Sequence, residues 1–149
     1  MPPRTPLVLR RIYPVAPRDL EQAGTVSTEV RRELLALGMS PNVVRRASVI
    51  CFEGEMNIVL YSHGGRVILL VKEDRVELLF SDDGPGIADV ELVSQPGYST
   101  APDWARELGF GAGLGINNME QNSDLFEIRS RVGEGTVVRA TILLGVPFF

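Results

Sequence analysis

The stretch that most constrains the fold is residues 78–87, LLFSDDGPGI. A mostly apolar run from Val76 to Phe80 leads into two adjacent acids, Asp82 and Asp83, and then into a Gly-Pro-Gly turn. This run has strand length and ends at turn residues, so it predicts a strand that enters the core. The two glycines of the turn permit positive φ and the close approach of another group.

A carboxylate at the buried end of a strand needs a donor, because an unpaired buried charge is costly. An exocyclic amine of a purine would serve, since an ionised Asp only accepts. From this segment alone, an ordinary turn with two solvated acids is an equally good interpretation.

Composition narrows the class of protein. A chain of 149 residues, with 44% hydrophobic and 23% charged residues, most simply forms a single soluble domain over residues 1–149. The net charge of −4 argues against a nucleic-acid partner. The single cysteine, Cys51, excludes an internal disulfide and suits a reducing cytoplasm, and one Cys with one His makes a Cys/His zinc site implausible. No apolar run reaches membrane-spanning length, and the first residues lack the apolar region of a signal peptide. We therefore expect a cytoplasmic protein that is not integral to a membrane.

The first third of the chain predicts a strand and two helices. Residues 7–15 are short, β-prone and interrupted by Pro14, which favours a strand at a sheet edge. From Pro17, apolar residues recur at spacings of three or four as far as Leu37, which predicts a helix that ends at Gly38. Ser40 and Pro41 predict the start of a second helix, which we expect to end near residues 62–65.

The remainder predicts mainly hairpins. Residues 66–71 and 75–80 read as two strands joined across 72–74, and residues 125–132 and 136–144 as two more joined by Gly-Glu-Gly. Residues 88–93 and 116–122 are expected to be short helices. Residues 94–112 have no periodicity, which is typical of a functional lid or of disorder. The order predicts an α+β two-layer sandwich, with helices on one face of a mixed, mostly antiparallel sheet.

Two polar residues share one face of the second helix. Glu53 and Asn57 are four residues apart, so together they could supply a general base and an oxygen ligand for a cation such as Mg²⁺. The alternative is the polar face of a surface helix. Gly54 is unexpected in a helix interior and indicates close approach of another backbone or of a ligand. Glu55 is expected to be a solvated acid. His63, the only histidine, favours a helix C-terminal cap over a catalyst.

A second glycine-rich stretch precedes the short helix at 116–122. Its glycines alternate strictly from Gly109 to Gly115. Glycines that lead into a helix expose backbone N–H groups, which suits polyphosphate. The stretch lacks the Gly-Lys-Ser/Thr ending of a Walker A loop, and a flexible linker is the alternative.

Together these segments resemble a known family. The motifs E53-x-x-x-N57, D82-x-G84-x-G86, the alternating glycines from 109 to 115, and G133-x-G135-T136 look like the four ATP-site boxes of the gyrase/Hsp90/histidine-kinase/MutL (GHKL) superfamily. Within it, the chain is most similar to the small bacterial anti-sigma factors and switch serine kinases of partner-switching modules. The resemblance covers residues 8–144 and implies a Bergerat-type ATP-binding fold.

The resemblance also implies roles for individual residues. Glu53 would be the general base and Asn57 the Mg²⁺ ligand, while Asp82 would accept from the adenine amine and Thr136 would assist adenine recognition. A lid at about 94–112 would wrap the phosphates. The positions assigned to ATP binding are Asn57, Asp82, Gly84, Gly86, Ile87, Gly109, Gly111, Ala112, Gly113, Leu114, Gly115 and Thr136.

The expected activity is that of an ATP-dependent protein serine/threonine kinase. Its usual substrate in this family is a small antagonist domain of the STAS type. A nucleotide-gated module that holds a sigma factor or a phosphatase without turnover is the alternative. Glu55 leaves the identity of the base open, the insertion at 101–108 is longer than in the shortest switch kinases, and the strand edge near Pro14 could support a homodimer.

Overall fold

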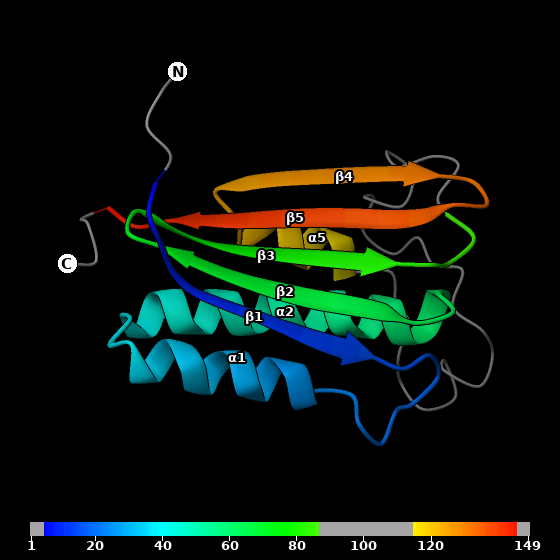
Figure 1. The fold of residues 1–149 in the computed structure, drawn as a ribbon, viewed down its shortest axis with the longest axis horizontal. Coiled ribbons are helices and arrows are strands. Elements are labelled where there is room, and N and C mark those ends of the chain that lie inside the picture. Colours follow the sequence, from blue (N-terminus) through cyan, green and yellow to red (C-terminus); the bar gives the residue numbers. More distant parts are fainter. Residues whose placement is uncertain (1–4, 87–114, 146–149) are drawn as a thin grey trace.

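Five strands form one antiparallel sheet, and the helices cover one of its faces (Figure 1). The computed structural model describes residues 5–86 and 115–145. In chain order its elements are β1 (Leu7–Val15), α1 (Thr25–Ala36), α2 (Pro41–Tyr61), β2 (Gly65–Lys72), β3 (Arg75–Asp82), α5 (Gly115–Gln121), β4 (Leu125–Arg131) and β5 (Gly135–Leu143). The strands lie in the order β1-β2-β3-β5-β4. The α+β sandwich expected from the sequence is confirmed; the helix expected at 88–93 and the lid at 94–112 lie outside the described residues.

The first strand lies at a sheet edge, as expected. Among the strands that the structure describes, β1 pairs only with β2, and its register shifts between Leu7 and Leu9. Pro14 stands opposite Arg66 near the end of the ladder. A proline and a bulge are tolerated there because an edge strand has a side that no ladder uses.

The first helix begins later than its periodicity predicts. α1 starts at Thr25, not near Pro17, and its N-cap residue Gly24 is left-handed with φ 93°. Arg18 also has positive φ, 58°, and donates its N–H to the Val59 carbonyl at 2.9 Å. Leu20 still packs against the core, so a turn can mimic a helical spacing. The helix ends before Gly38, whose φ of 78° confirms the expected left-handed stop.

The second helix has the bounds that its capping residues predict. The Ser40 side chain accepts from the Val43 N–H at 3.3 Å, and Pro41 occupies the first turn. α2 ends at Tyr61. Ser62 caps the helix, because both the N–H and the hydroxyl of Ser62 donate to the Ile58 carbonyl. His63 is the next residue and is exposed, so the C-terminal cap is its neighbour.

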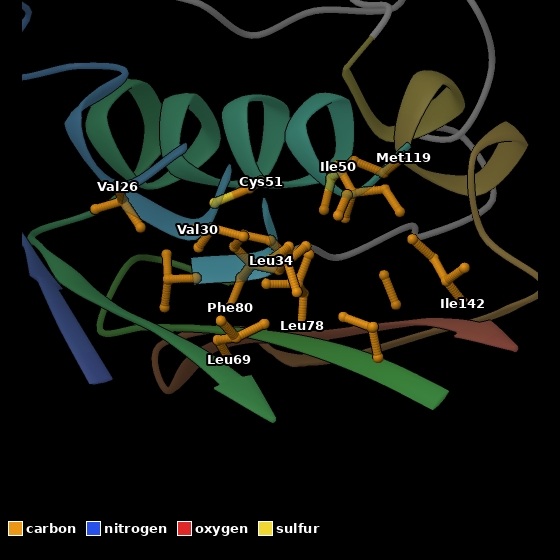
Figure 2. Packing of buried hydrophobic residues seen from close by; sticks show 14 of the residues in the cluster. Val26, Val30, Leu34, Ile50, Cys51, Leu69, Leu78, Phe80, Met119 and Ile142 are labelled. Carbon is orange, nitrogen blue, oxygen red and sulfur yellow. The ribbon is translucent and has the colours of Figure 1, made fainter. Parts of the chain in front are cut away.

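The core lies between the sheet and the helices (Figure 2). Apolar side chains of α1 and α2 meet those of β2, β3 and β5, and α5 adds Met119, which is fully buried. Gly54 is explained here, because a Cβ at this position would overlap the ring of Phe80 on β3. The expected close approach to Gly54 is therefore confirmed, but its partner is an aromatic ring and not a backbone or a ligand. Within the described residues, no helix is long and apolar enough to cross a membrane.

Candidate functional site

The sheet brings Asp82 and Thr136 together. They are directly opposite each other in the β3–β5 register, although they are 54 positions apart in the sequence. Asp82 is half-buried, and its Oδ1 accepts from the Gly84 N–H at 2.8 Å. Burial raises the pKa of Asp82, while hydrogen bonds from the backbone of Gly84 and Thr136 lower it in part. The strand end thus carries the desolvated acceptor that the sequence predicts.

Thr136 contributes a hydroxyl beside this carboxylate. The residue is 8% exposed, and its Oγ1 lies 2.8 Å from the hydroxyl of Ser130 on β4. A buried hydroxyl can both donate and accept, so the pair of hydroxyls extends the polar end of the sheet. Asp82 and Thr136 therefore form one polar site on adjacent strands.

The Gly-Pro-Gly turn after β3 packs against the β4–β5 turn. Gly86 has a φ of 79°, and a Cβ there would overlap the Arg131 carbonyl. The Gly133 N–H donates to the Pro85 carbonyl at 2.7 Å. These contacts require glycine at position 86 for internal packing, and they fix the turn that follows Asp82. Ile87, the next expected site residue, lies outside the described residues.

Glu53 and Asn57 converge on the start of α5. A Cβ at Gly115 would lie 3.0 Å from Glu53 Oε2 and 3.3 Å from Asn57 Oδ1. The one-face arrangement expected from their spacing is confirmed, and both side chains are half-buried. The last glycine of the alternating run thus lies directly over the two residues. Gly109, Gly111, Ala112, Gly113 and Leu114 lie outside the described residues.

Two further residues of α5 contact this pair, and the sequence analysis missed them. The Asn118 amide donates to Glu53 Oε1 at 3.4 Å, and the Asn57 amide lies 3.9 Å from the Met119 sulfur. Asn118 and Met119 are three and four residues beyond Gly115, so all three share a helix face. That spacing was the signal that could have identified them.

Glu55 is not the solvated acid that we expected. It is 2% exposed and accepts from the N–H groups of Ser27 at 3.3 Å and Val26 at 3.5 Å, at the start of α1. Burial raises the pKa of Glu55, and these backbone hydrogen bonds offset part of the shift. Because α1 has no side-chain cap of its own at Gly24, Glu55 serves the orphan N–H groups of that helix. Of the two neighbouring acids, Glu53 alone faces Gly115.

A separate hollow of about 440 Å³ lies elsewhere on the molecule. Its lining includes Arg75, Glu77 and Arg139, on strands β3 and β5. Glu77 alternates with Leu78 and Phe80, so it lies on the face of the sheet opposite the helices. Arg139 at 2.8 Å and Lys72 at 3.2 Å neutralise its buried carboxylate. This hollow is therefore distinct from the site around Glu53.

Comparison with known proteins shows which proteins the chain is similar to. No family model matches it. It is 36% identical over 93 residues to the anti-sigma F factor of Pasteuria penetrans, which is 58% of this chain and 59% of that protein. It is 41% identical over 64 residues to the anti-sigma F factor of Heyndrickxia coagulans, covering 43% and 40%. It is 29% identical over 126 residues to the serine/threonine-protein kinase RsbT of Bacillus subtilis (strain 168), covering 82% and 86%. The chain thus spans less than two thirds of the two anti-sigma F factors.

The fold and the polar residues at α2, β3 and β5 are consistent with a GHKL-like sandwich. The names of the similar proteins indicate partner-switching regulators and kinases. The chain is similar to proteins named anti-sigma F factor and to the serine/threonine-protein kinase RsbT.

Proposed function

We propose that this protein is an ATP-dependent kinase that phosphorylates a Ser or Thr of an antagonist protein of the STAS type. One observation carries the proposal. Glu53 and Asn57 converge on Gly115 at the end of the glycine run, while the competing acid, Glu55, is committed to α1. A carboxylate and an amide oxygen therefore lie together beside Gly115, and they could serve as the base and the oxygen ligand. The kinase name of RsbT supports the same activity.

The residues at the end of β3 fit the adenine end of ATP. Asp82 is a half-buried carboxylate, and an ionised carboxylate has more acceptor positions than Gly84 and Thr136 use. An exocyclic amine would supply a donor to this desolvated group. The Thr136 hydroxyl beside it can donate or accept, which suits ring nitrogens of a purine.

The residues of α2 fit the phosphate end. The structure contains no cluster of three or more His, Cys, Asp or Glu within the residues that it describes. A resident metal cage is not needed for Mg²⁺, which is commonly held by one or two protein oxygens together with substrate phosphates. Asn57 would supply such an oxygen through Oδ1. The bound nucleotide and Mg²⁺ would supply the phosphoryl group and neutralise its charge.

Glu53 would act as the general base. Its carboxylate would accept the proton of the partner's hydroxyl as the hydroxyl oxygen forms its bond to phosphorus and the bond to the leaving ADP oxygen breaks. Half-burial against α5 restricts the side chain and reduces its contact with water. Positioning of this kind supplies much of the rate in phosphoryl transfer.

A second function is supported by the names of other relatives. Several are called anti-sigma F factor, which favours a module that holds a sigma factor or a phosphatase when ATP is bound. Both functions use the same nucleotide site. They differ in whether Glu53 is needed, because only a kinase requires a base.

The test is phosphoryl transfer from labelled ATP with Mg²⁺ to STAS-type domains, by the wild-type protein and by Glu53→Gln. The kinase proposal predicts that the wild type labels one domain and that Glu53→Gln binds ATP normally but labels at least about 100-fold more slowly. Glu120→Gln, an exposed acid on α5, is the matched control and should label at the wild-type rate. Tight ATP binding without labelling of any domain would contradict the kinase and favour the binding module.

A further inference from the structure

We propose that Asn118 positions the catalytic base, which rests on the function proposed above. Asn118 holds one oxygen of the Glu53 carboxylate and so directs the other toward the phosphoryl acceptor. It is a positioning residue, because it acts through Glu53 and not on the nucleotide.

The two oxygens of Glu53 have different surroundings. Oε1 accepts from the Asn118 amide at 3.4 Å. Oε2 faces the start of α5, where a Cβ at Gly115 would lie 3.0 Å away. One oxygen is therefore occupied by a donor, and the other lies beside Gly115. A side chain held at one oxygen cannot rotate freely about its last bond, so the second oxygen keeps one direction.

The donor itself comes from a firmly held helix. Met119, the next residue, is fully buried in the core. The Asn118 carbonyl accepts from the Asn122 side-chain amide at 2.8 Å and from the Asn122 N–H at 3.3 Å. Arg46 of α2 in turn donates to the Asn122 carbonyl at 3.0 Å. α5 is thus tied to α2 beyond Asn118, and the amide that orients Glu53 comes from a helix that is already held in place.

This arrangement couples the base to Gly115, the first residue of α5. Gly115, which faces Glu53 and Asn57, is the first residue of α5, and Asn118 lies three residues later on the same face. A shift of α5 would therefore move the Asn118 donor and the residues over Asn57 together. The base is aligned only when α5 is docked on α2.

The chain offers a matched control for the test. Asn117 is the same residue type on the same helix and is also half-buried, but its side chain makes no hydrogen bond to any described residue. Asn118→Leu removes the amide and keeps the number and branching of the side-chain heavy atoms, and Asn118→Asp keeps the shape but replaces the donor with an acceptor. Asn117→Leu tests a general effect of an apolar side chain on α5. Thermal unfolding of each variant establishes that it folds.

Kinetics form the first arm of the experiment. We expect Asn118→Leu and Asn118→Asp to lower kcat about 10- to 100-fold, the range for a hydrogen bond to a charged group, with the KM for ATP within about twofold of wild type. In a Glu53→Gln background the same changes should have almost no further effect, because the residue acts through Glu53. A kcat for Asn118→Leu equal to that of Asn117→Leu would overturn the proposal. So would an equal loss in the presence and absence of Glu53.

The second arm does not depend on turnover. In the nucleotide-free protein, the side-chain amide resonances of Asn118 should shift when Glu53 is replaced by Ala, while those of Asn117 stay in place. Unchanged Asn118 resonances would contradict the contact on which the proposal depends. If the wild type labels no partner, the proposed kinase function fails, and the amide resonances still decide whether Asn118 holds the Glu53 carboxylate.

Discussion

Replacing Gly54 by Ala is a sharp test of how α2 is held against the sheet. Gly54 lies in the interior of α2, where glycine is disfavoured, and it faces the ring of Phe80 on β3. A Cβ at this position would lie 2.6 Å from Phe80 Cζ and closer still to two other ring atoms. Real Cβ atoms do not approach so closely, so either the ring or the helix must move.

Two effects of opposite sign decide how much Gly54→Ala changes the free energy of unfolding. Alanine in a helix interior is favoured over glycine by about 1 kcal/mol. Overpacking of a well-filled core costs about 1–3 kcal/mol. Phe80 is only 3% exposed and has no open space to swing into, so the upper part of that range applies. We therefore expect Gly54→Ala to lower the free energy of unfolding by about 1–2 kcal/mol.

Urea unfolding followed by circular dichroism measures this change, and a second substitution identifies its cause. Phe80→Leu removes the ring atoms that collide and destabilises the protein by itself through a cavity. In the Phe80→Leu background, Gly54→Ala should be neutral or stabilising, which gives a coupling of about 1–3 kcal/mol. If Gly54→Ala is as stable as the wild type, or if its cost persists without the ring, the packing described here is wrong.

Two further predictions concern the site and its neighbour. Gly115→Ala should lower the rate of phosphoryl transfer at least about 10-fold, because its Cβ would displace the ends of Glu53 and Asn57. The free energy of unfolding should change by less than about 1 kcal/mol. Gly145→Ala is the control and should leave the rate unchanged, since its Cβ would have no described atom within 4 Å beyond its chain neighbours. Because burial raises the pKa of Glu55, the folded protein binds this proton more tightly than the unfolded chain, so stability falls as pH rises from about 4.3 through the folded pKa. Urea unfolding from pH 4 to 8 should show this fall in the wild type relative to Glu55→Gln; parallel curves for the two proteins would contradict the assignment.

The strands and the second helix were predictable because their signals are local. Ser40 and Pro41 start α2 through contacts within four residues, and the turns of the two hairpins lie between strands that follow one another directly. The one-face arrangement of Glu53 and Asn57 follows from the helix repeat alone. For these elements, the tertiary structure adds little to what neighbouring residues specify.

Most of the predictions that were wrong involve contacts between distant segments. Helical spacing predicts that Glu55 is a solvated acid, and only the packing of α1 on α2 shows that it accepts from N–H groups 28 and 29 residues away. The late start of α1 depends on that same acceptor and on the left-handed Gly24. The partner of Gly54 is a ring on another strand, and Asn118 contacts Glu53 across 65 residues. Periodicity identifies the face of a helix but does not identify what lies against it.

The central claim, a nucleotide site at the end of β3, is tested most directly by calorimetric titration of the protein with ATP and Mg²⁺. Asp82→Asn and Asp83→Asn form a matched pair, since Asp82 is half-buried beside Thr136 and Asp83 is exposed. Loss of a hydrogen bond to a charged acceptor should weaken ATP binding by Asp82→Asn about 10- to 100-fold, with Asp83→Asn within about twofold of wild type. Equal affinities of the two variants, or no binding by the wild type, would contradict the account.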